Sequence, residues 1–391
     1  MSHVSLSALF RKYSILLLCL SLLAACGTPK PNLDLTSLIK VQSGSADKIF
    51  PLLEDLASQL PSDGAGIAVG YVEGEETTIA FVGNPAFTEE TLFEYASITK
   101  VLTANILMQL VNEGNLHLDD SLNEFLPEDI QEQHWEAVTL RHLATHTAGI
   151  PDLPPSLSTV RLANLEIDPF ANYDQAMLYQ DIQATKVRSI GKWKYSNYGY
   201  ALLGLVLSQQ TNLDYAVLVE QRIFEPLGMK DATIEGWSSN NIASPLNPSG
   251  GSSNHWNYEA FASAGALRGN ILDGVAFLKA SMSACQSSGI ITRSNCQTQQ
   301  STDIRIYKNS QMGLGWNRTP KNDNIVIWKN GISGGYSVFV GFNPEKHIGI
   351  VLLSNVKLFQ PFFVDSTAVA FLLSVQQAVT MVIFMAQEKY F

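Results

Sequence analysis

Segments that favour β-strands lie near both ends of this chain and enclose a long middle with helical periodicity. Residues 66–72 and 77–82 are rich in apolar and β-branched side chains and flank a Glu-Gly-Glu turn, which predicts a hairpin. Similar segments recur at residues 325–329, 336–342 and 347–353. Because strands from both ends can bury their apolar faces in one sheet, we expect an α+β fold: an antiparallel sheet flanked by helices, with an inserted all-helical domain.

Residues 97–112 predict the clearest helix of the middle. Apolar side chains recur there at three- and four-residue intervals, and Gly114 fits a C-terminal cap. Other strong helical patterns cover residues 198–210, 215–224 and 271–282. Ahead of the hairpin, Ser45 is expected to cap an amphipathic helix over residues 45–60.

These patterns set the expected domain boundaries. Residues 45–95 and 300–391 form a discontinuous sheet domain, residues 96–299 form the helical domain, and the site is expected between them. Residues 366–387 carry no charge, and we expect them to form a helix packed on the sheet. A second membrane anchor is the alternative, although Gln376 and Gln377 would be costly in lipid.

The N-terminal residues have the pattern of an export signal. Arg11 and Lys12 precede an apolar stretch, residues 13–22, that is too short for an ordinary transmembrane helix. Leu23-Ala24-Ala25-Cys26 resembles the bacterial lipobox. The resemblance implies a signal peptide over residues 1–25, a lipid on Cys26 and a tether over residues 26–44. A plain secretory signal is the alternative.

The expected location is therefore the cell envelope, with the protein facing the periplasm. Gly27, rather than an Asp, follows the lipidated position, which favours the outer membrane where the host has one. Cys19 leaves with the signal and Cys26 takes lipid, so Cys285 and Cys296 remain. An oxidising compartment favours a disulfide between them over two free thiols.

The charge balance limits the partners. The formal net charge is −11, and the chain has no Lys/Arg run, which argues against nucleic acid and against electrostatic binding to anionic membranes. The 46% of apolar residues suffices for a sizeable core. We expect no cofactor or metal, a lipid contact only through Cys26, and a monomer.

Ser97-Ile98-Thr99-Lys100 is the first candidate for chemistry. A serine hydroxyl needs a neighbouring base, and positions i and i+3 of a helix share a face, so Lys100 is expected beside Ser97. The positive end of the helix dipole also favours negative charge at its first turn. The same Ser-x-x-Lys pattern recurs at Ser37, Ser45, Ser189 and Ser354, but only Ser97 opens a long apolar helix.

Two further motifs carry groups that complement a serine nucleophile. In Tyr195-Ser196-Asn197, the tyrosine could act as a general base if two ammonium groups stabilised its phenolate, and Asn197 could orient the lysine or bind a substrate amide. Lys329-Asn330-Gly331 lies on a predicted strand. There Lys329 could bind a carboxylate, and Gly331 would let a substrate approach the backbone closely.

Two other patterns suggest different chemistry. Gly331-Ile332-Ser333-Gly334-Gly335 matches the α/β-hydrolase elbow, but downstream His347 precedes Asp365, which reverses the order that fold requires. His142 and His146 have the spacing of helical zinc ligands, yet Leu143 replaces the catalytic Glu and no third ligand is evident. We interpret them as structural residues near a helix end.

Together, the three motifs resemble those of serine β-lactamases and penicillin-binding proteins, in the class C β-lactamase-like, D-alanyl-D-alanine carboxypeptidase-related branch. The similarity extends over roughly residues 60–355. It includes Asp119-Asp120-Ser121-Leu122, Leu143-Ala144-Thr145-His146-Thr147-Ala148-Gly149-Ile150, Ile223-Phe224-Glu225-Pro226-Leu227-Gly228-Met229 and Gly313-Leu314-Gly315-Trp316.

The resemblance implies roles for the candidate residues. Ser97 is the nucleophile, Lys100 its activating partner and Tyr195 the shared acid/base. Asn197, Lys329, Asn330 and Gly331 bind substrate, and the backbone N–H groups of Ser97 and Ile332 form the oxyanion hole.

The expected substrate is a peptidoglycan stem peptide of the D-alanyl-D-alanine type. Class C β-lactamases usually carry Lys-Thr-Gly and Tyr-Ala-Asn, so Asn330 and Ser196 weaken the expectation of efficient β-lactam turnover. Alternatives are a β-lactamase, a carboxylic ester hydrolase and a non-catalytic binding lipoprotein.

Overall fold

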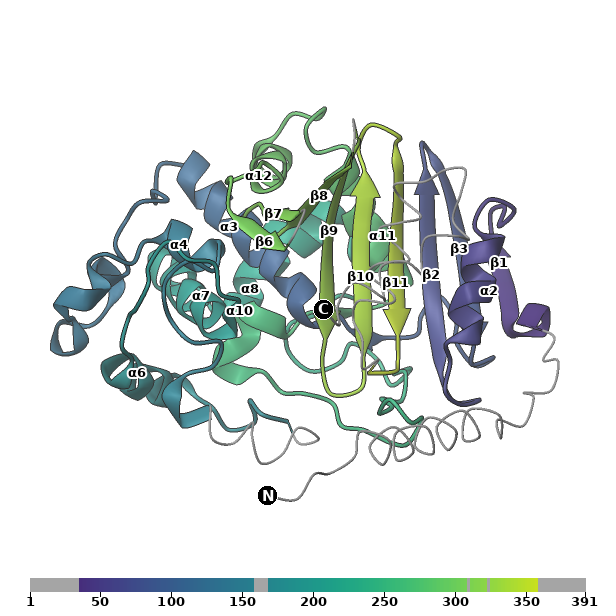
Figure 1. Ribbon diagram of the computed structural model, residues 1–391, viewed down its shortest axis with the longest axis horizontal. Helices are drawn as coiled ribbons and strands as arrows, with labels where there is room; N and C mark the ends of the chain where they lie inside the picture. The colour runs from purple at the N-terminus through teal and green to yellow at the C-terminus, as the bar shows by residue number, and fades with distance from the viewer. Residues whose placement is uncertain (1–34, 158–167, 308–309, 322–323, 358–391) are drawn as a thin grey trace, which may run out of the picture. The chain divides into compact units, whose positions relative to one another are not determined.

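An antiparallel sheet joins strands from both ends of the described chain, which confirms the predicted fold class. The computed structural model describes residues 35–157, 168–307, 310–321 and 324–357. Within these ranges the sheet has nine strands in the order β1-β3-β2-β11-β10-β9-β8-β7-β6 (Figure 1). They are β1 (Ile39–Ser43), β2 (Gly66–Glu73), β3 (Glu76–Gly83), β6 (Arg305–Tyr307), β7 (Ser310–Met312), β8 (Asn317–Lys321), β9 (Asn324–Ile332), β10 (Ser337–Asn343) and β11 (Ile348–Ser354).

The centre of the sheet is where the two chain ends meet. Strands β2 and β11 pair antiparallel, with Ala68 opposite Leu353 and Gly70 opposite Val351. The predicted hairpin is confirmed as β2 and β3, which turn at Gly74, whose φ of +57° suits glycine. Every residue of β10 and β11 is buried, so both faces of these strands are covered.

The helices lie mainly between the two groups of strands in the sequence. The α-helices are α2 (Phe50–Ser58), α3 (Thr99–Asn112), α4 (Leu140–Ala144), α6 (Gln175–Ala184), α7 (Asn197–Thr211), α8 (Tyr215–Val219), α9 (Glu225–Leu227), α10 (Ala262–Gly265), α11 (Ile271–Met282) and α12 (Ile290–Thr298). The short 3₁₀ segments are η1 (Leu35–Leu38), η2 (Ala96–Ile98), η3 (Leu122–Phe125), η4 (Glu128–Ile130), η5 (Gln133–Trp135) and η7 (Glu259–Phe261). A π-helical turn, η6 (Glu220–Phe224), continues α8, and β4 (Phe93–Glu94) pairs with β5 (Arg268–Gly269).

Helix α11 covers the sheet, although it falls within the segment expected to form the helical domain. It packs against β2, β10 and β11, behind the strands in Figure 1. Glycines permit the close approach, because a Cβ on Gly70 would lie 2.5 Å from Val275. One core cluster contains Val351 of the sheet together with Leu202 of α7. The described residues from Leu38 onward belong to one compact unit, so sheet and helices share a single core.

Two segments near residue 45 differ from the expectation. Residues 39–43, expected in the tether, form the edge strand β1, which pairs with β3 from Ile39 opposite Val82. The helix expected to begin at Ser45 begins instead at Phe50. Its first turn contains Pro51, which lacks an N–H and is well tolerated there, while the Ser45 carbonyl accepts a hydrogen bond from Thr78 Oγ1 at 2.7 Å.

Cys285 and Cys296 form a disulfide in the structure. The first cysteine follows α11 and the second lies within α12. Helix α12 in turn packs against α3, where Asn112 Nδ2 donates to Ser294 Oγ at 2.9 Å. The bond therefore joins a helix on the sheet to one that supports the helix after Ser97.

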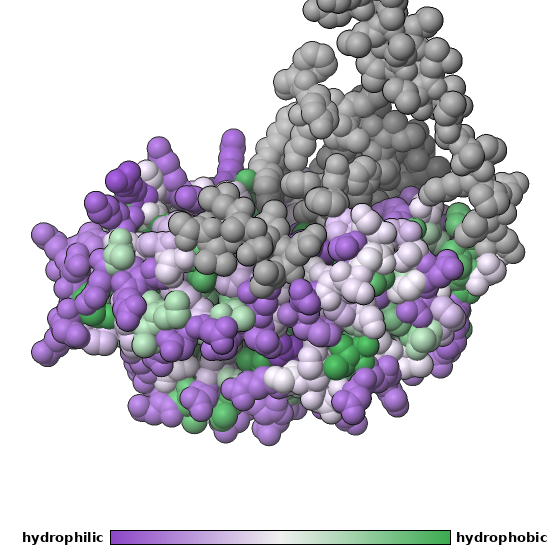
Figure 2. Space-filling view, turned by 90° about the horizontal axis from the view of Figure 1, so that it is seen from below, coloured by the Kyte–Doolittle hydropathy of each residue, from purple (hydrophilic) through white to green (hydrophobic). Residues whose placement is uncertain are grey.

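Several expectations concern residues outside the described ranges. These are the signal peptide, Cys26 and the apolar segment at residues 366–387. No helix within the described ranges is both long enough and apolar enough to cross a membrane. On the face drawn in Figure 2, hydrophilic residues predominate, and hydrophobic residues gather only in small patches.

Candidate active site

Ser97 lies in η2, at the N-terminal end of α3. The preceding residue, Ala96, has φ +48°, a conformation that a non-glycine residue adopts only when its surroundings hold it. Those surroundings are visible: Tyr95 donates its backbone N–H to the Leu267 carbonyl at 2.8 Å and its hydroxyl to the Asn270 carbonyl at 2.6 Å. Two anchored contacts thus fix the backbone that presents Ser97.

Lys100 lies one helical turn after Ser97 and is fully buried. Its Nζ is 3.0 Å from Ser97 Oγ, 2.7 Å from Asn197 Oδ1 and 2.6 Å from the Ala264 carbonyl oxygen. All three oxygen atoms can accept from the amine, and the Ser97 hydroxyl can also donate to it. Ser97, one turn before Lys100, and Asn197, from a distant segment, therefore both contact the Lys100 nitrogen.

The environment of Lys100 favours its neutral form. Burial lowers the pKa of Lys100 well below its usual range, the nearby charge of Lys329 lowers it further, and Asp152 opposes both effects. Lys329 is itself buried, on β9. A neutral amine at this position can accept the proton of Ser97.

Tyr195 completes the contacts of the serine. Its hydroxyl lies 2.7 Å from Ser97 Oγ. The Nζ of Lys100 lies 5.1 Å from the centre of the Tyr195 ring, and the Nζ of Lys329 lies 5.2 Å from it. The two lysines thus both lie close to the tyrosine ring.

Gly331 allows β9 to approach the backbone at Ser97. A Cβ at position 331 would lie 2.3 Å from the Tyr95 carbonyl oxygen and 3.0 Å from the Ser97 nitrogen, so only glycine fits. Ile332 follows at the end of β9, opposite Ser337. Asn330 lies between Lys329 and Gly331, and the alternation of a strand directs its side chain to the opposite face.

Asp152 is a residue that the sequence analysis missed. Its Oδ1 accepts two hydrogen bonds from Asn197, from the backbone nitrogen at 3.1 Å and from Nδ2 at 2.8 Å. Its own carbonyl accepts from the Tyr198 N–H at 2.9 Å. The only sequence signal was its place two residues after a segment that resembles the family, and that place alone does not suggest a role.

His146 also lies beside the site. It is buried, its ring centre is 4.4 Å from that of Tyr195, and its Nδ1 accepts a hydrogen bond from the Ser196 N–H at 3.1 Å. Burial lowers the pKa of His146 well below its usual range, and the charges of Lys329 and Lys100 lower it further. The neutral ring therefore packs against Tyr195 and supports the residue next to it.

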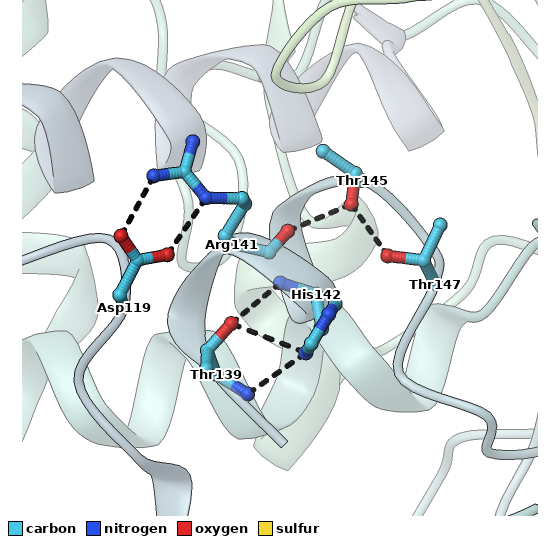
Figure 3. A network of polar contacts seen from close by, with 6 residues as sticks. All are labelled: Asp119, Thr139, Arg141, His142, Thr145 and Thr147. Carbon is cyan, nitrogen blue, oxygen red and sulfur yellow. Dashed lines mark hydrogen bonds and ion pairs between the residues drawn. The ribbon is translucent and has the colours of Figure 1, made fainter. Parts of the chain in front are cut away.

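His142 has a separate structural role, shown in Figure 3. Its Nδ1 accepts the Thr139 N–H at 3.2 Å in a capping box at the start of α4, and nearby Arg141 pairs with Asp119. The two histidines are thus engaged in different contacts. The part of the chain that the structure describes contains no group of three metal-ligating side chains.

Ser333, the serine of the elbow-like pattern, lies in the turn between β9 and β10. It is fully buried, and its N–H donates to the Tyr336 carbonyl at 3.1 Å. A hydrolase elbow places its serine exposed between a strand and a helix. The position of Ser333 between two antiparallel strands excludes that interpretation.

Comparisons with known proteins find relatives of this chain. A family model described as Beta-lactamase matches residues 53–374. The D-alanyl-D-alanine-carboxypeptidase/endopeptidase AmpH of Escherichia coli K12 is 25% identical over 313 residues, which cover 74% of this chain and 78% of that protein. A protein named Beta-lactamase from the same strain is 24% identical over 328 residues, covering 71% and 79%.

Solved structures show the same fold. A class C β-lactamase from Rhodobacter sphaeroides superposes with a TM-score of 0.70 at 18% identity, covering 84% of this chain and 99% of that one. The D-alanine carboxypeptidase AmpC from Burkholderia cenocepacia gives 0.66 at 24% identity, covering 84% and 97%. At these identities the likeness extends to the fold alone.

Proposed function

This chain belongs to the β-lactamase family and is a serine hydrolase, and from that premise we propose that it is a D-alanyl-D-alanine-type peptidase of the cell envelope that is acylated at Ser97. One observation carries the proposal: Ser97 Oγ contacts both Lys100 Nζ, at 3.0 Å, and Tyr195 OH, at 2.7 Å. A nucleophile in contact with two groups that can move protons is what a two-step acyl transfer requires.

In the acylation step, neutral Lys100 takes the proton of Ser97 as Oγ attacks the substrate carbonyl carbon. The resulting oxyanion lies at the backbone N–H groups of Ser97 and Ile332. When the carbon–nitrogen bond breaks, Tyr195 donates its proton to the leaving amine and receives one from Lys100. Lys100 is neutral again at the end of this step.

In the deacylation step, water attacks the acyl carbon and gives a proton to the base formed by Lys100 and Tyr195. The bond between Ser97 Oγ and the acyl carbon then breaks, and Oγ takes that proton back. Asn197 binds the substrate amide, and Lys329 binds the substrate carboxylate near the tyrosine. The products are an amine and a carboxylic acid, with the enzyme restored.

Two findings support a peptidase. AmpH is named a carboxypeptidase/endopeptidase, and this chain has Lys329-Asn330-Gly331 in place of the Lys-Thr-Gly usual in class C β-lactamases. The second candidate function is β-lactam hydrolysis, which the relative named Beta-lactamase supports. An ester hydrolase and a non-catalytic lipoprotein are the remaining alternatives.

The proposed location is a lipid-anchored position in the envelope. It rests on the lipobox-like residues that end at Cys26. Metabolic labelling with a fatty acid tests it, since wild type would carry the label and Cys26→Ser would not. Equal labelling of the two proteins would contradict the lipid anchor.

A time course of penicillin binding followed by mass spectrometry tests the function. A stable adduct on the peptide that contains Ser97 would support a slowly deacylated, penicillin-binding peptidase. Rapid loss of penicillin with little adduct would favour the β-lactamase. Neither an adduct nor turnover would contradict both and leave the esterase or the non-catalytic lipoprotein.

A further inference from the structure

The carboxylate of Asp152 is hydrogen-bonded to Asn197, which in turn contacts Lys100. Asp152 Oδ1 accepts from both nitrogen donors of Asn197, at 3.1 Å and 2.8 Å. Asn197 is the first residue of α7, where backbone N–H groups have no partner within the helix. The Ser196 hydroxyl accepts the Gly199 N–H at 2.9 Å. Asp152 accepts the backbone N–H of Asn197 with its carboxylate and that of Tyr198 with its backbone carbonyl.

This contact determines which way the Asn197 amide points. A carboxylate only accepts hydrogen bonds, so it binds the NH₂ end of the amide and leaves the carbonyl end for Lys100, whose Nζ lies 2.7 Å away. The flipped amide would bring its NH₂ group to the lysine and its carbonyl oxygen to the carboxylate. The contact between the carbonyl oxygen and the carboxylate would be repulsive whatever the protonation state of Lys100.

Asp152 is also the counter-charge among the groups that face Lys100. Lys329 approaches from β9, His146 follows α4, and the rings of Tyr195 and Tyr200 lie 5.1 Å and 5.6 Å from Lys100 Nζ. The carboxylate of Asp152 opposes the effect that burial and Lys329 have on the pKa of Lys100. Orientation and charge therefore act on the same amine.

We propose that Asp152 is a positioning residue for acyl transfer, which holds the Asn197 carbonyl toward Lys100 and offsets the positive charge at Lys100. The inference rests on the proposed function, in which Lys100 activates Ser97. It assigns Asp152 no contact with the substrate.

The first test measures the rate at which a fluorescent penicillin acylates the full-length protein across pH. In Asp152→Ala the maximal rate falls roughly 10- to 100-fold, the range expected when a supported group loses its position. Asp152→Asn keeps an acceptor for Asn197 and removes the charge. Its maximal rate stays close to that of wild type, while its acid limb moves to lower pH because Lys100 loses protons more easily. An Asp152→Ala protein with the wild-type rate would overturn the proposal.

Asp174→Ala is the matched control, because Asp174 also accepts a backbone N–H, from Met177 at 2.9 Å, but it caps α6. Its acylation rate stays at the wild-type value.

A double-mutant cycle then tests whether Asp152 acts through Asn197. The double variant Asp152→Ala/Asn197→Ala should be no slower than Asn197→Ala alone. Two independent, additive losses would overturn the proposal.

A second measurement needs no reaction and separates this inference from the proposed function. The Lys100 amine is titrated by NMR in protein carrying ¹³C-labelled lysine, with Lys100→Met assigning the signal. Its midpoint lies at lower pH in Asp152→Asn than in wild type. An unchanged midpoint overturns the coupling of Asp152 to Lys100. A shifted midpoint in a protein that penicillin does not acylate supports the coupling and contradicts the acylation mechanism.

Discussion

The cluster around Ser97 and the cluster around Asp181 both bury polar side chains, but they differ in how their charges are balanced. Asp181 of α6 is 5% exposed and accepts hydrogen bonds from the Ser156 N–H at 3.1 Å and from the Tyr173 hydroxyl at 2.7 Å. One carboxylate is thus surrounded by neutral donors. Around Ser97, two buried lysines lie 5.1 Å and 5.2 Å from the ring centre of one tyrosine, Tyr195.

The difference shows which cluster serves stability. A buried charge with several hydrogen-bond donors is satisfied in the folded state. Two buried ammonium groups repel each other, and burial disfavours the charged form of each. A protein that keeps such a pair gains reactivity at the cost of stability, which is the usual sign of a functional site. The following substitutions test that contrast.

Ser97→Ala is expected to have the largest effect. Without the hydroxyl no acyl-enzyme can form, so turnover falls on the order of 10⁶-fold, as for other lost nucleophiles. The Ala variant keeps the contacts that fix Tyr95, so its thermal unfolding matches wild type. Mass spectrometry with penicillin measures the adduct, and full residual activity would refute the assignment of Ser97.

Lys100→Met should lower the acylation rate by roughly 10²- to 10⁴-fold, the usual contribution of a general base. It removes a buried amine that Lys329 repels but also leaves the Ala264 carbonyl without its donor, so its free energy of unfolding should change little. Tyr195→Phe should lose activity in the same range. Stopped-flow acylation and urea unfolding measure the two quantities, and a near wild-type rate in either variant would disprove the proton route.

Asp181→Ala should give the opposite result. It leaves the buried Tyr173 hydroxyl and the Ser156 donors without their acceptor, which costs about 1–3 kcal/mol of unfolding free energy. The rate of acylation per folded molecule should not change. Asp181→Asn, which keeps an acceptor, should lose less stability. A loss of activity at constant stability would contradict the claim that the Asp181 cluster serves stability and the Ser97 cluster serves activity.

Lys329→Met should produce the smallest effect, a displacement of the pH profile. Acylation requires neutral Lys100, so its rate rises as pH passes upward through the pKa of Lys100. Lys329 lowers that pKa, and removing its charge raises it. The acid limb should therefore move to higher pH when acylation is followed with a neutral ester that needs no carboxylate contact. A limb that stays in place would show that the two lysines are not coupled.

Local patterns in the sequence predicted a large part of the fold. The hairpin of β2 and β3, the helix after Ser97 and the helix at residues 271–282 follow from alternation, helical spacing and turn residues, each read within a short window. The edge strand β1 was missed because it has only five residues, which are mostly exposed, so the alternation of Ile39 and Val41 with polar residues is too short to stand out. The location of α11 on the sheet could not be predicted, because the periodicity of a helix does not show which element it packs against.

The candidate site also contains residues that could be predicted and residues that could not. Ser97, Lys100 and Tyr195 could be predicted because their side chains are reactive and lie in recognisable motifs. The carbonyl of Ala264, which accepts from Lys100, belongs to a residue type that carries no chemical signal, and it lies 164 positions away. Asp152 and His146 lie 45 and 50 positions from the residues that they support. Contacts across such distances exist only once the fold has formed.

The disulfide has a consequence for when the protein matures. It links α12, which packs against the helix after Ser97, to the segment that follows α11 on the sheet. Such bonds form and persist in oxidising compartments and are rare in the bacterial cytosol. A chain exported as proposed would form this disulfide only after crossing the membrane. The protein would then gain its final covalent link in the compartment where cell-wall peptides are found.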